Sequence, residues 1–166
     1  EGKIGAYGVA TWNGFSYEPS HVEHLCLATL VRIAREVGGE AHGFKFVQFP
    51  YNLGKTSGYT VPTQVLEDER ILPAFGAAKA LGLEVIFSSA LLQMHLFKGA
   101  FSEKTVAVLG GESDIQAALQ FARCANGVTC ALFGSQDPLH VKHNFGLNTQ
   151  ARVPQKHYNL LYRMSA

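Results

Sequence analysis

The sequence has no large excess of either charge, few cysteines and no long hydrophobic run. Its 166 residues include 14 Lys and Arg and 13 Asp and Glu, which leaves a net charge of +1. Such a balance provides no electrostatic attraction for nucleic acid or an anionic membrane surface. The longest apolar stretch, residues 83–92, is interrupted by Glu84, Ser88 and Ser89 and is too short to span a bilayer. We therefore expect neither a nucleic acid nor a membrane as a partner.

Cysteine is also scarce, and its spacing indicates no chemistry. Cys26, Cys124 and Cys130 are odd in number and form no C-x-x-C pair. We interpret them as reduced, buried cysteines of a cytoplasmic protein. The chain has the length of one domain. It shows no secretory signal and no initiator Met, so we expect a trimmed or partial chain.

Segments typical of strands alternate with segments typical of helices. The predicted strands are residues 4–11, 44–49, 83–89 and 128–133. Four successive β-then-α units predict a parallel sheet with right-handed crossovers. Eight such units make a (β/α)8 TIM barrel of about 250 residues. We therefore predict an α/β fold, half of a (β/α)8 barrel, with four parallel strands and crossover helices.

The first predicted helix follows from apolar spacing. Residues at steps of three and four form its expected buried face: Val22, Cys26, Leu30, Ile33 and Val37. This spacing is typical of an amphipathic helix, and Gly38-Gly39 ends it.

A long loop is predicted over residues 52–65, which are rich in Gly, Thr, Ser and Pro. Residues 67–69 then place negative charge where the dipole of a helix N-terminus favours it. Ile71, Phe75 and Ala78 are the expected buried stripe of that second helix.

Capping signals mark the later helices. After another predicted loop, Ser113 with Gln116 reads as a capping box. Asp137 and Pro138 are typical of the N-cap and first position of a helix. We also expect a short terminal helix around Tyr158.

Four phrases resemble one protein family. They are GKIGAYGVATWN at residues 2–13, VQFPYNL at residues 47–53, LGLEVIFSSALLQ at residues 81–93, and the ordered matches within residues 118–144. They are similar to the fifth, sixth, seventh and last β/α units of the aldo-keto reductases, NAD(P)H-dependent carbonyl reductases built on a (β/α)8 barrel. The resemblance covers nearly the whole chain but only the C-terminal half of the family's domain. It implies that residues 1–166 are a single partial domain.

The resemblance implies a nicotinamide cofactor, either NADP or NAD. Thr11 and Gln48 match positions that bind the nicotinamide carboxamide, and Phe87 matches an aromatic that stacks on the nicotinamide ring. Ser88 and Leu91 match the loop around the pyrophosphate. Five residues match the adenine and 2′-phosphate site: Gly134, Ser135, His140, His143 and Asn144.

The implied phosphate site has opposing features. A small-residue turn that leads into a helix N-terminus presents free N–H groups to a phosphate. The carboxylate of Asp137 opposes a phosphate, and His140 compensates for it only when protonated. The choice between NADP and NAD therefore stays open. We predict no metal site.

A purely structural role stays open as the alternative for several of these residues. Gln48 could satisfy backbone groups at a strand end, and Phe87 could be a core aromatic. The histidines could lie on solvated helix surfaces.

The resemblance assigns no catalytic residue to this chain. The family's Asp, Tyr, Lys and His belong to its first four β/α units, and Tyr7, Tyr17 and Lys55 are unpaired on sequence evidence. We therefore expect a cofactor-binding half of an oxidoreductase that reduces a small carbonyl substrate only as the complete protein. The alternatives are a non-catalytic nucleotide-binding, regulatory or interaction module, and an unrelated doubly wound α/β enzyme.

A half barrel has two unpaired sheet edges. Residues that face the barrel interior also lose the side chains that would cover them. We expect Val9, Val47 and Ile86 to be among these residues. We therefore expect self-association or pairing with an N-terminal half.

Overall fold

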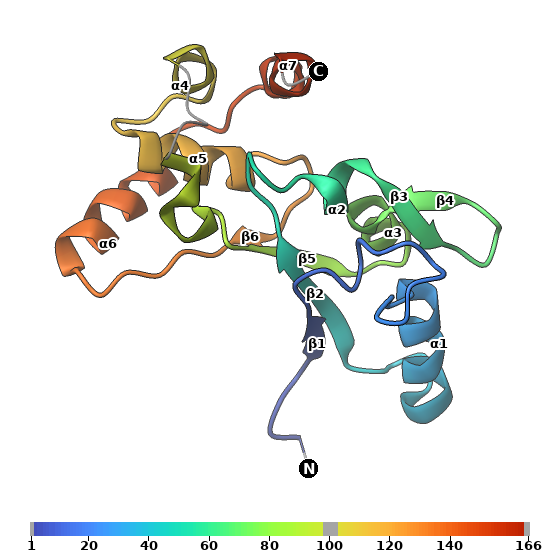
Figure 1. Ribbon diagram of the computed structural model, residues 1–166. Coiled ribbons are helices and arrows are strands. Elements are labelled where there is room, and N and C mark those ends of the chain that lie inside the picture. The colour runs from blue at the N-terminus through green and yellow to red at the C-terminus, as the bar shows by residue number, and fades with distance from the viewer. Residues whose placement is uncertain (1, 98–102, 165–166) are drawn as a thin grey trace. The chain divides into compact units, whose positions relative to one another are not determined.

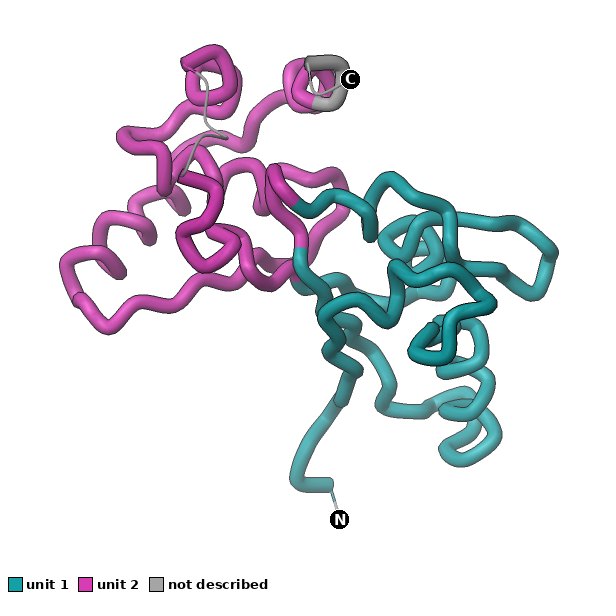
Figure 2. Tube along the Cα trace, in the orientation of Figure 1, with its two compact units in different colours: residues 1–50, 55–86 teal, residues 51–54, 87–166 magenta. Residues whose placement is uncertain are grey.

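A computed structural model describes residues 2–97 and 103–164 of the chain (Figure 1). The chain divides into two compact units (Figure 2). The first comprises residues 1–50 and 55–86, and the second comprises residues 51–54 and 87–166. The interpretation of residues 1–166 as one partial domain stays a prediction.

The main sheet has four parallel strands, in the order β1-β2-β5-β6. Its strands are β1 (Tyr7–Ala10), β2 (Phe44–Pro50), β5 (Glu84–Ser88) and β6 (Cys130–Ala131). The predicted α/β sheet of four parallel strands is confirmed. Strand β6 is much shorter than the predicted segment 128–133, although the Leu132 backbone N–H still donates to the Phe87 carbonyl oxygen over 2.8 Å.

Strands β1 and β2 approach each other closely at Gly8. Val9 pairs with Val47 and Ala10 pairs with Gln48, and the register shifts between Tyr7 and Gly8. A Cβ atom at Gly8 would lie 2.2 Å from the Phe46 carbonyl oxygen. Only glycine fits this position without moving β2.

The two faces of β2 and β5 differ in burial. Val47 and Val85 are fully buried, whereas Phe46 and Ile86 are half-buried. Because alternate residues of a strand face opposite sides, Val47 faces the covered side. Our expectation that Val47 shares an uncovered inward face with Ile86 was therefore wrong.

Helix α1 (Leu27–Gly38) begins later than predicted and buries a different face. Its buried residues are Leu27, Ala28, Val31 and Ala34. Val22 and Val37 of the expected stripe are 96% and 86% exposed. The expected stripe was wrong because a set shifted by one position has the same helical spacing. The predicted stop is confirmed, since Gly39 follows the helix with a φ of +66°.

The side chain of Gln64 caps the N-terminus of helix α1. Cys26 is the N-cap residue but forms no side-chain cap. The buried Gln64 Oε1 accepts the Leu27 backbone N–H over 2.8 Å. Its Nε2 donates to the carbonyl oxygens of Phe15, over 2.9 Å, and Leu25, over 3.1 Å. One amide therefore joins helix α1 to the loop that precedes it.

Gln64 itself lies in a hairpin that the sequence analysis missed. Strand β3 (Pro62–Val65) pairs antiparallel with β4 (Ile71–Pro73), and the short helix α2 (Ser57–Thr60) precedes them. The predicted loop over 52–65 and the helix from residue 67 were wrong.

The next helix, α3 (Ala74–Ala80), begins only after the hairpin. Ile71 lies in β4 and is 57% exposed, whereas Phe75 and Ala78 are buried as expected. Acidic residues before an apolar run suit a helix N-terminus and a polar hairpin turn equally, which explains the error.

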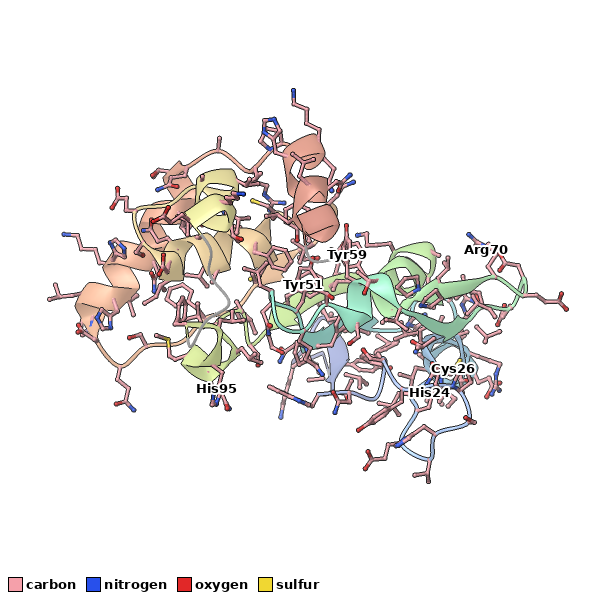
Figure 3. The ribbon with its side chains drawn as sticks, turned by 45° about the horizontal axis from the view of Figure 1, so that its top comes forward. His24, Cys26, Tyr51, Tyr59, Arg70 and His95 are labelled. Carbon is pink, nitrogen blue, oxygen red and sulfur yellow. The ribbon has the colours of Figure 1, made fainter. Side chains whose placement is uncertain are left out.

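The hairpin turn holds the acidic residues that we assigned to a helix. Glu69 adopts a φ of +65°. Arg70 (Figure 3) donates from Nε to the Asp68 carboxylate over 2.7 Å. This hydrogen bond lowers the pKa of Asp68 below its usual value. Both side chains are more than half exposed, so the pair contributes little to stability.

The second unit is mainly helical. Its helices are η1 (Leu92–Phe97), α4 (Glu103–Leu109), α5 (Asp114–Arg123), α6 (Pro138–Phe145), η2 (Gly146–Thr149) and α7 (Gln155–Met164). The predicted N-caps are confirmed: Ser113 accepts the Gln116 backbone N–H over 3.3 Å, and Asp137 accepts that of Leu139 over 2.8 Å. The capping box is incomplete, because Gln116 Oε1 accepts the Glu112 backbone N–H rather than that of Ser113.

Stacked aromatic rings form the core of the second unit. Tyr51 lies 4.4 Å from Phe87 and 5.0 Å from Phe121, between ring centroids. The Tyr158 hydroxyl donates to the Phe121 carbonyl oxygen over 2.8 Å and lies 2.7 Å from the Tyr51 hydroxyl. The expected terminal helix is confirmed as α7, which Tyr158 anchors to this core.

The three cysteines are free, but only one is buried. Cys124 is buried, Cys26 is half-buried and Cys130 is exposed. Our expectation that all three are buried was wrong for Cys130, which lies in β6 at the end of the sheet order, and for Cys26, which is only half-buried. In the part of the chain that the structure describes, no helix has the length and apolar character needed to cross a membrane.

We expect the substitution Gln64→Met to destabilise the protein strongly. It removes three hydrogen bonds and leaves buried backbone groups without partners, at about 1–3 kcal/mol for each unsatisfied group. The control is Gln136→Met, because Gln136 is exposed. Chemical denaturation measures the difference in the free energy of unfolding, provided that both variants unfold with the same dependence on denaturant concentration. Equal midpoints for the two variants would contradict the capping role of Gln64.

Candidate functional site

A cavity of about 330 Å³ lies within the second unit, between the segments that follow β5 and β6. We call it the strand-end cavity. Its lining residues are Ser89, Ala90, Leu91, Gln93, Met94, Leu132, Phe133 and Gly134. Ligands of open and closed α/β sheets bind where parallel strands end. The cavity brings together Leu91 and Gly134, two predicted site residues from distant segments.

The backbone on one side of the strand-end cavity is strained. Four residues other than glycine have positive φ values there: Ser89 (53°), Leu92 (46°), Gln93 (51°) and Met94 (66°). Each such conformation costs about 1–3 kcal/mol and is typical of ligand-binding segments.

Buried Asn52 helps to hold this backbone. Its Nδ2 donates to the Ser89 carbonyl oxygen over 2.9 Å, and its Oδ1 accepts the Gly54 backbone N–H over 3.0 Å. Asn52 belongs to the phrase VQFPYNL, but the sequence analysis gave this asparagine no role.

Asn144 lines a second cavity of the second unit, of about 250 Å³. Its side chain is only 7% exposed. Its Oδ1 is buried and has no hydrogen-bond partner among the described residues. A buried carbonyl oxygen without a donor is costly, so this position suits a ligand that donates a hydrogen bond.

Two arginines line the same cavity as Asn144. Arg123 donates to the Gln120 side chain and, over 2.7 Å, to the Gln150 carbonyl oxygen. Arg152 is exposed. Neither arginine occupies a position that matches the family phrases, so the sequence did not point to either of them. They give the cavity a positive character.

Gln48 lies in the first unit, beside a cavity of about 260 Å³ at strands β1 and β2. Its backbone carbonyl oxygen accepts the Thr11 N–H over 3.0 Å. Its side-chain amide is half-buried and forms no hydrogen bond to a described residue. The amide is therefore available to a ligand.

Thr11 lies next to Gln48 at the end of strand β1. Its Oγ1 accepts the Gly14 backbone N–H over 3.0 Å and so stabilises the turn that follows. The hydroxyl can still donate its own hydrogen. The structure thus places the backbones of Thr11 and Gln48 next to each other, joined by a backbone hydrogen bond.

Phe87 lies in the core rather than at an open site. It is 0% exposed and packs against Tyr51. Stacking on a nicotinamide ring would require it to leave this core. The neighbouring Ser88 is half-buried, and its carbonyl oxygen accepts the Tyr51 backbone N–H over 3.1 Å.

The remaining predicted residues lie just before α6 and along it, from Ser135 to His143 in its last turn, without sharing a cavity. Ser135 Oγ accepts the Asp137 backbone N–H over 3.2 Å. His140 Nε2 lies 3.7 Å from an Asp137 carboxylate oxygen. His143 Nε2 lies 3.3 Å from Ser113 Oγ. Both histidines are exposed.

Lys55 and Tyr17 are joined through Asn13, although the sequence showed them as unpaired. Lys55 Nζ donates to Asn13 Oδ1 over 2.6 Å, and Asn13 Nδ2 donates to the Tyr17 hydroxyl oxygen over 3.2 Å. The available signal was that Asn13 and Lys55 follow neighbouring parallel strands. Within residues 2–97 and 103–164, no group of three or more His, Cys, Asp or Glu side chains could hold a metal ion.

Comparison with known proteins gives structural likeness only. No family model matches the sequence, and no curated protein matches it. A thermostable aldo-keto reductase in complex with the inhibitor epalrestat is 15% identical, with a TM-score of 0.54 over 82% of this chain. An aldo-keto reductase from Bacillus halodurans, in its holo form, is 10% identical, with a TM-score of 0.58 over 96% of this chain. Its apo form is also 10% identical, with a TM-score of 0.54 over 97% of this chain.

The chain spans only part of these structures. It covers 44% of the inhibitor complex, 49% of the holo form and 62% of the apo form. At these identities the likeness shows the fold alone. The recognition of an aldo-keto reductase fold over about half of a barrel is confirmed.

We expect Asn144→Leu to stabilise the ligand-free protein or leave its stability unchanged. The substitution removes a buried carbonyl oxygen that has no partner, and an unsatisfied group costs about 1–3 kcal/mol. The matched substitution Asn52→Leu should destabilise the protein, because Asn52 forms two hydrogen bonds. Thermal denaturation of both variants measures the contrast. A similar loss of stability in both would show that Asn144 is satisfied within the chain.

Proposed function

We propose that this chain is the cofactor-binding C-terminal half of an NAD(P)H-dependent aldo-keto reductase. The observation that supports this most is the strand-end cavity, which is lined by Leu91 and Gly134. The family resemblance assigns both residues to the cofactor, and the chain brings them together from separate β/α units. The complete protein would reduce a small carbonyl substrate.

The residues around Gln48 fit the nicotinamide end of the cofactor. A carboxamide offers two donors and one acceptor. The Gln48 amide has no partner among the described residues, and the Thr11 hydroxyl can donate. These two side chains would hold the carboxamide and so orient the ring. A bound NAD(P)H supplies the hydride for carbonyl reduction.

The family resemblance assigns the remaining parts of the cofactor to residues of the second unit. Ser88 and Leu91, with Gly134 and Ser135, would contact the phosphates. Asn144 Oδ1 would accept a hydrogen bond from the adenine amino group. Phe87 is not included, because it is fully buried in the core.

The choice between NADP and NAD depends on the charges beside α6. Asp137 lies 3.7 Å from His140, and its carboxylate disfavours a 2′-phosphate nearby. His143, 3.9 Å from Glu112, is likewise beside a carboxylate. Either histidine helps a phosphate only when it is protonated. We therefore propose a nicotinamide dinucleotide as the cofactor and leave the choice between NADP and NAD to the titration below.

We expect purified chain to bind NADPH or NADH with saturation. Titration followed by the fluorescence of the reduced nicotinamide measures the affinity for each cofactor. Gln48→Leu should weaken binding by about 3- to 10-fold, the range for one lost hydrogen bond.

The control for this titration is Gln155→Leu. Gln155 lies on helix α7 and pairs with Asn159, and it lines none of the three cavities described above. Equal affinity for wild type and Gln48→Leu would remove Gln48 from the site. The absence of saturable binding for both cofactors would contradict the proposed function.

We also expect the isolated chain to be a dimer or a larger oligomer. Strands β1 and β6 end the sheet order, and unpaired strand edges recruit further strands. Ile4, which precedes β1, is 73% exposed. Ile4→Lys should shift the equilibrium toward the monomer, whereas Val22→Lys, at a residue that is 96% exposed, should not.

Size-exclusion chromatography with light scattering measures this assembly. A stable wild-type monomer at micromolar concentration would contradict the expected self-association. In a mixture with an N-terminal half of the barrel, the same measurement tests the alternative pairing.

A further inference from the structure

Four side chains of the first unit form a cluster that the proposed cofactor contacts do not use. They are Trp12, Asn13, Tyr17 and Lys55, and we call them the Lys55 cluster. Lys55 Nζ donates to Asn13 Oδ1 and lies 5.9 Å from the centre of the Trp12 ring. Asn13 Nδ2 donates to the Tyr17 hydroxyl oxygen. Lys55, Asn13 and Tyr17 are half-buried.

The two hydrogen bonds fix the orientation of the Asn13 amide and the acceptor role of Tyr17. An ammonium group only donates, so it must face the oxygen of the Asn13 amide. The amide nitrogen then faces Tyr17, whose oxygen accepts. The Tyr17 hydroxyl hydrogen therefore remains available to an acceptor outside the cluster.

The charge of Lys55 has no partner of opposite sign among the described residues. Its ammonium carries three hydrogens, and the contact with Asn13 uses one of them. Arg32, Arg35 and Arg70 each pair with a carboxylate, whereas Lys55 contacts a neutral amide and an aromatic ring. A half-buried cation next to an unused hydroxyl donor favours an anionic ligand.

Neighbouring groups hold Tyr17 in place. Its ring stacks on His21 with centroids 3.9 Å apart and planes 15° apart. His24 (Figure 3) places Nδ1 2.8 Å from the Tyr17 carbonyl oxygen. The Glu23 backbone N–H donates to His21 Nδ1 over 3.1 Å. The tyrosine is therefore positioned before any ligand arrives, which reduces the entropy lost on binding.

Trp12 adds an apolar surface next to the charge. Its side chain is 49% exposed. Flat rings stack favourably on an exposed indole.

We propose that the Lys55 cluster binds the carboxylate of a small aromatic acid. The Lys55 ammonium and the Tyr17 hydroxyl donate to the carboxylate, and the ligand's ring packs against Trp12. The two donors contact opposite ends of one amide, so they lie within the span of one small ligand. The site uses residues other than those assigned to the cofactor and stands independently of the proposed function.

Trp12 reports on this site directly, because it is the only tryptophan of the chain. The experiment titrates the purified full chain with benzoate and follows tryptophan fluorescence. We expect a saturable change with benzoate. Benzamide, which has the same ring without the charge, should give a much weaker response, and acetate, which lacks the ring, should bind more weakly than benzoate.

Substitutions separate the contributions of the Lys55 charge and the Tyr17 hydroxyl to benzoate binding. Lys55→Met should weaken benzoate binding by about 10-fold or more, the effect of losing a charge-assisted hydrogen bond. Lys45→Met is the matched control, because Lys45 is exposed on β2 and lies outside the cluster; it should bind benzoate like wild type. Tyr17→Phe keeps the ring that stacks on His21 and should weaken binding about 10-fold.

Circular dichroism and the melting temperature show whether each variant is folded. If Lys55→Met does not fold, Lys55→Gln replaces it, since Gln can still donate to Asn13 without the charge.

Four outcomes would overturn the proposal. They are no saturable benzoate signal in wild type, equal binding of benzamide, unchanged benzoate affinity without the Lys55 charge, and loss of NADPH binding in the same variant. The last would assign Lys55 to the cofactor. Failure of the proposed function is seen separately, because the benzoate titration contains no cofactor.

Discussion

The first unit depends on one buried amide, that of Gln64. Helix α1 begins at Leu27 without a side-chain cap of its own, and a helix start leaves backbone N–H groups without partners. Gln64 accepts one of them and donates to the loop at Phe15 and Leu25. This amide positions the whole segment between β1 and α1, and that segment carries the Lys55 cluster.

A second buried group has the same role in the second unit. The Tyr158 hydroxyl joins helix α7 to the Phe121 carbonyl oxygen and to Tyr51. Asn52, next to Tyr51, then holds the Ser89 carbonyl at the strand-end cavity. Buried polar groups that are fully satisfied specify one arrangement of their neighbours. In both units such groups fix the segments after the strands, where the candidate sites lie.

Sequence patterns correctly predicted the features that depend only on residues close together in the chain. The four strands, the stop at Gly39 and the caps Ser113 and Asp137 are local features, and the structure confirms them. The β3–β4 hairpin and the buried face of α1 were mispredicted. Gln64 lies in this hairpin and caps α1 from a distant part of the sequence, so no spacing rule within one segment could reveal that contact. Phe87 likewise shows the same local pattern whether it is a core aromatic or a ring at a ligand.

The candidate sites differ in the same way: residues of one were predicted from local sequence phrases, and the contact in the other depends on strand pairing. Leu91 and Gly134 were predicted because a family phrase carries each of them, and the strand-end cavity joins them. Lys55 and Asn13 belong to different β/α units, and their contact arises because parallel strands β1 and β2 end side by side. Only the pairing of strands decides which loops meet. Functional sites in such a fold are therefore formed by pairs of loops. The role of a polar residue that follows one strand can be assigned only when the polar residue that follows the neighbouring strand is also known.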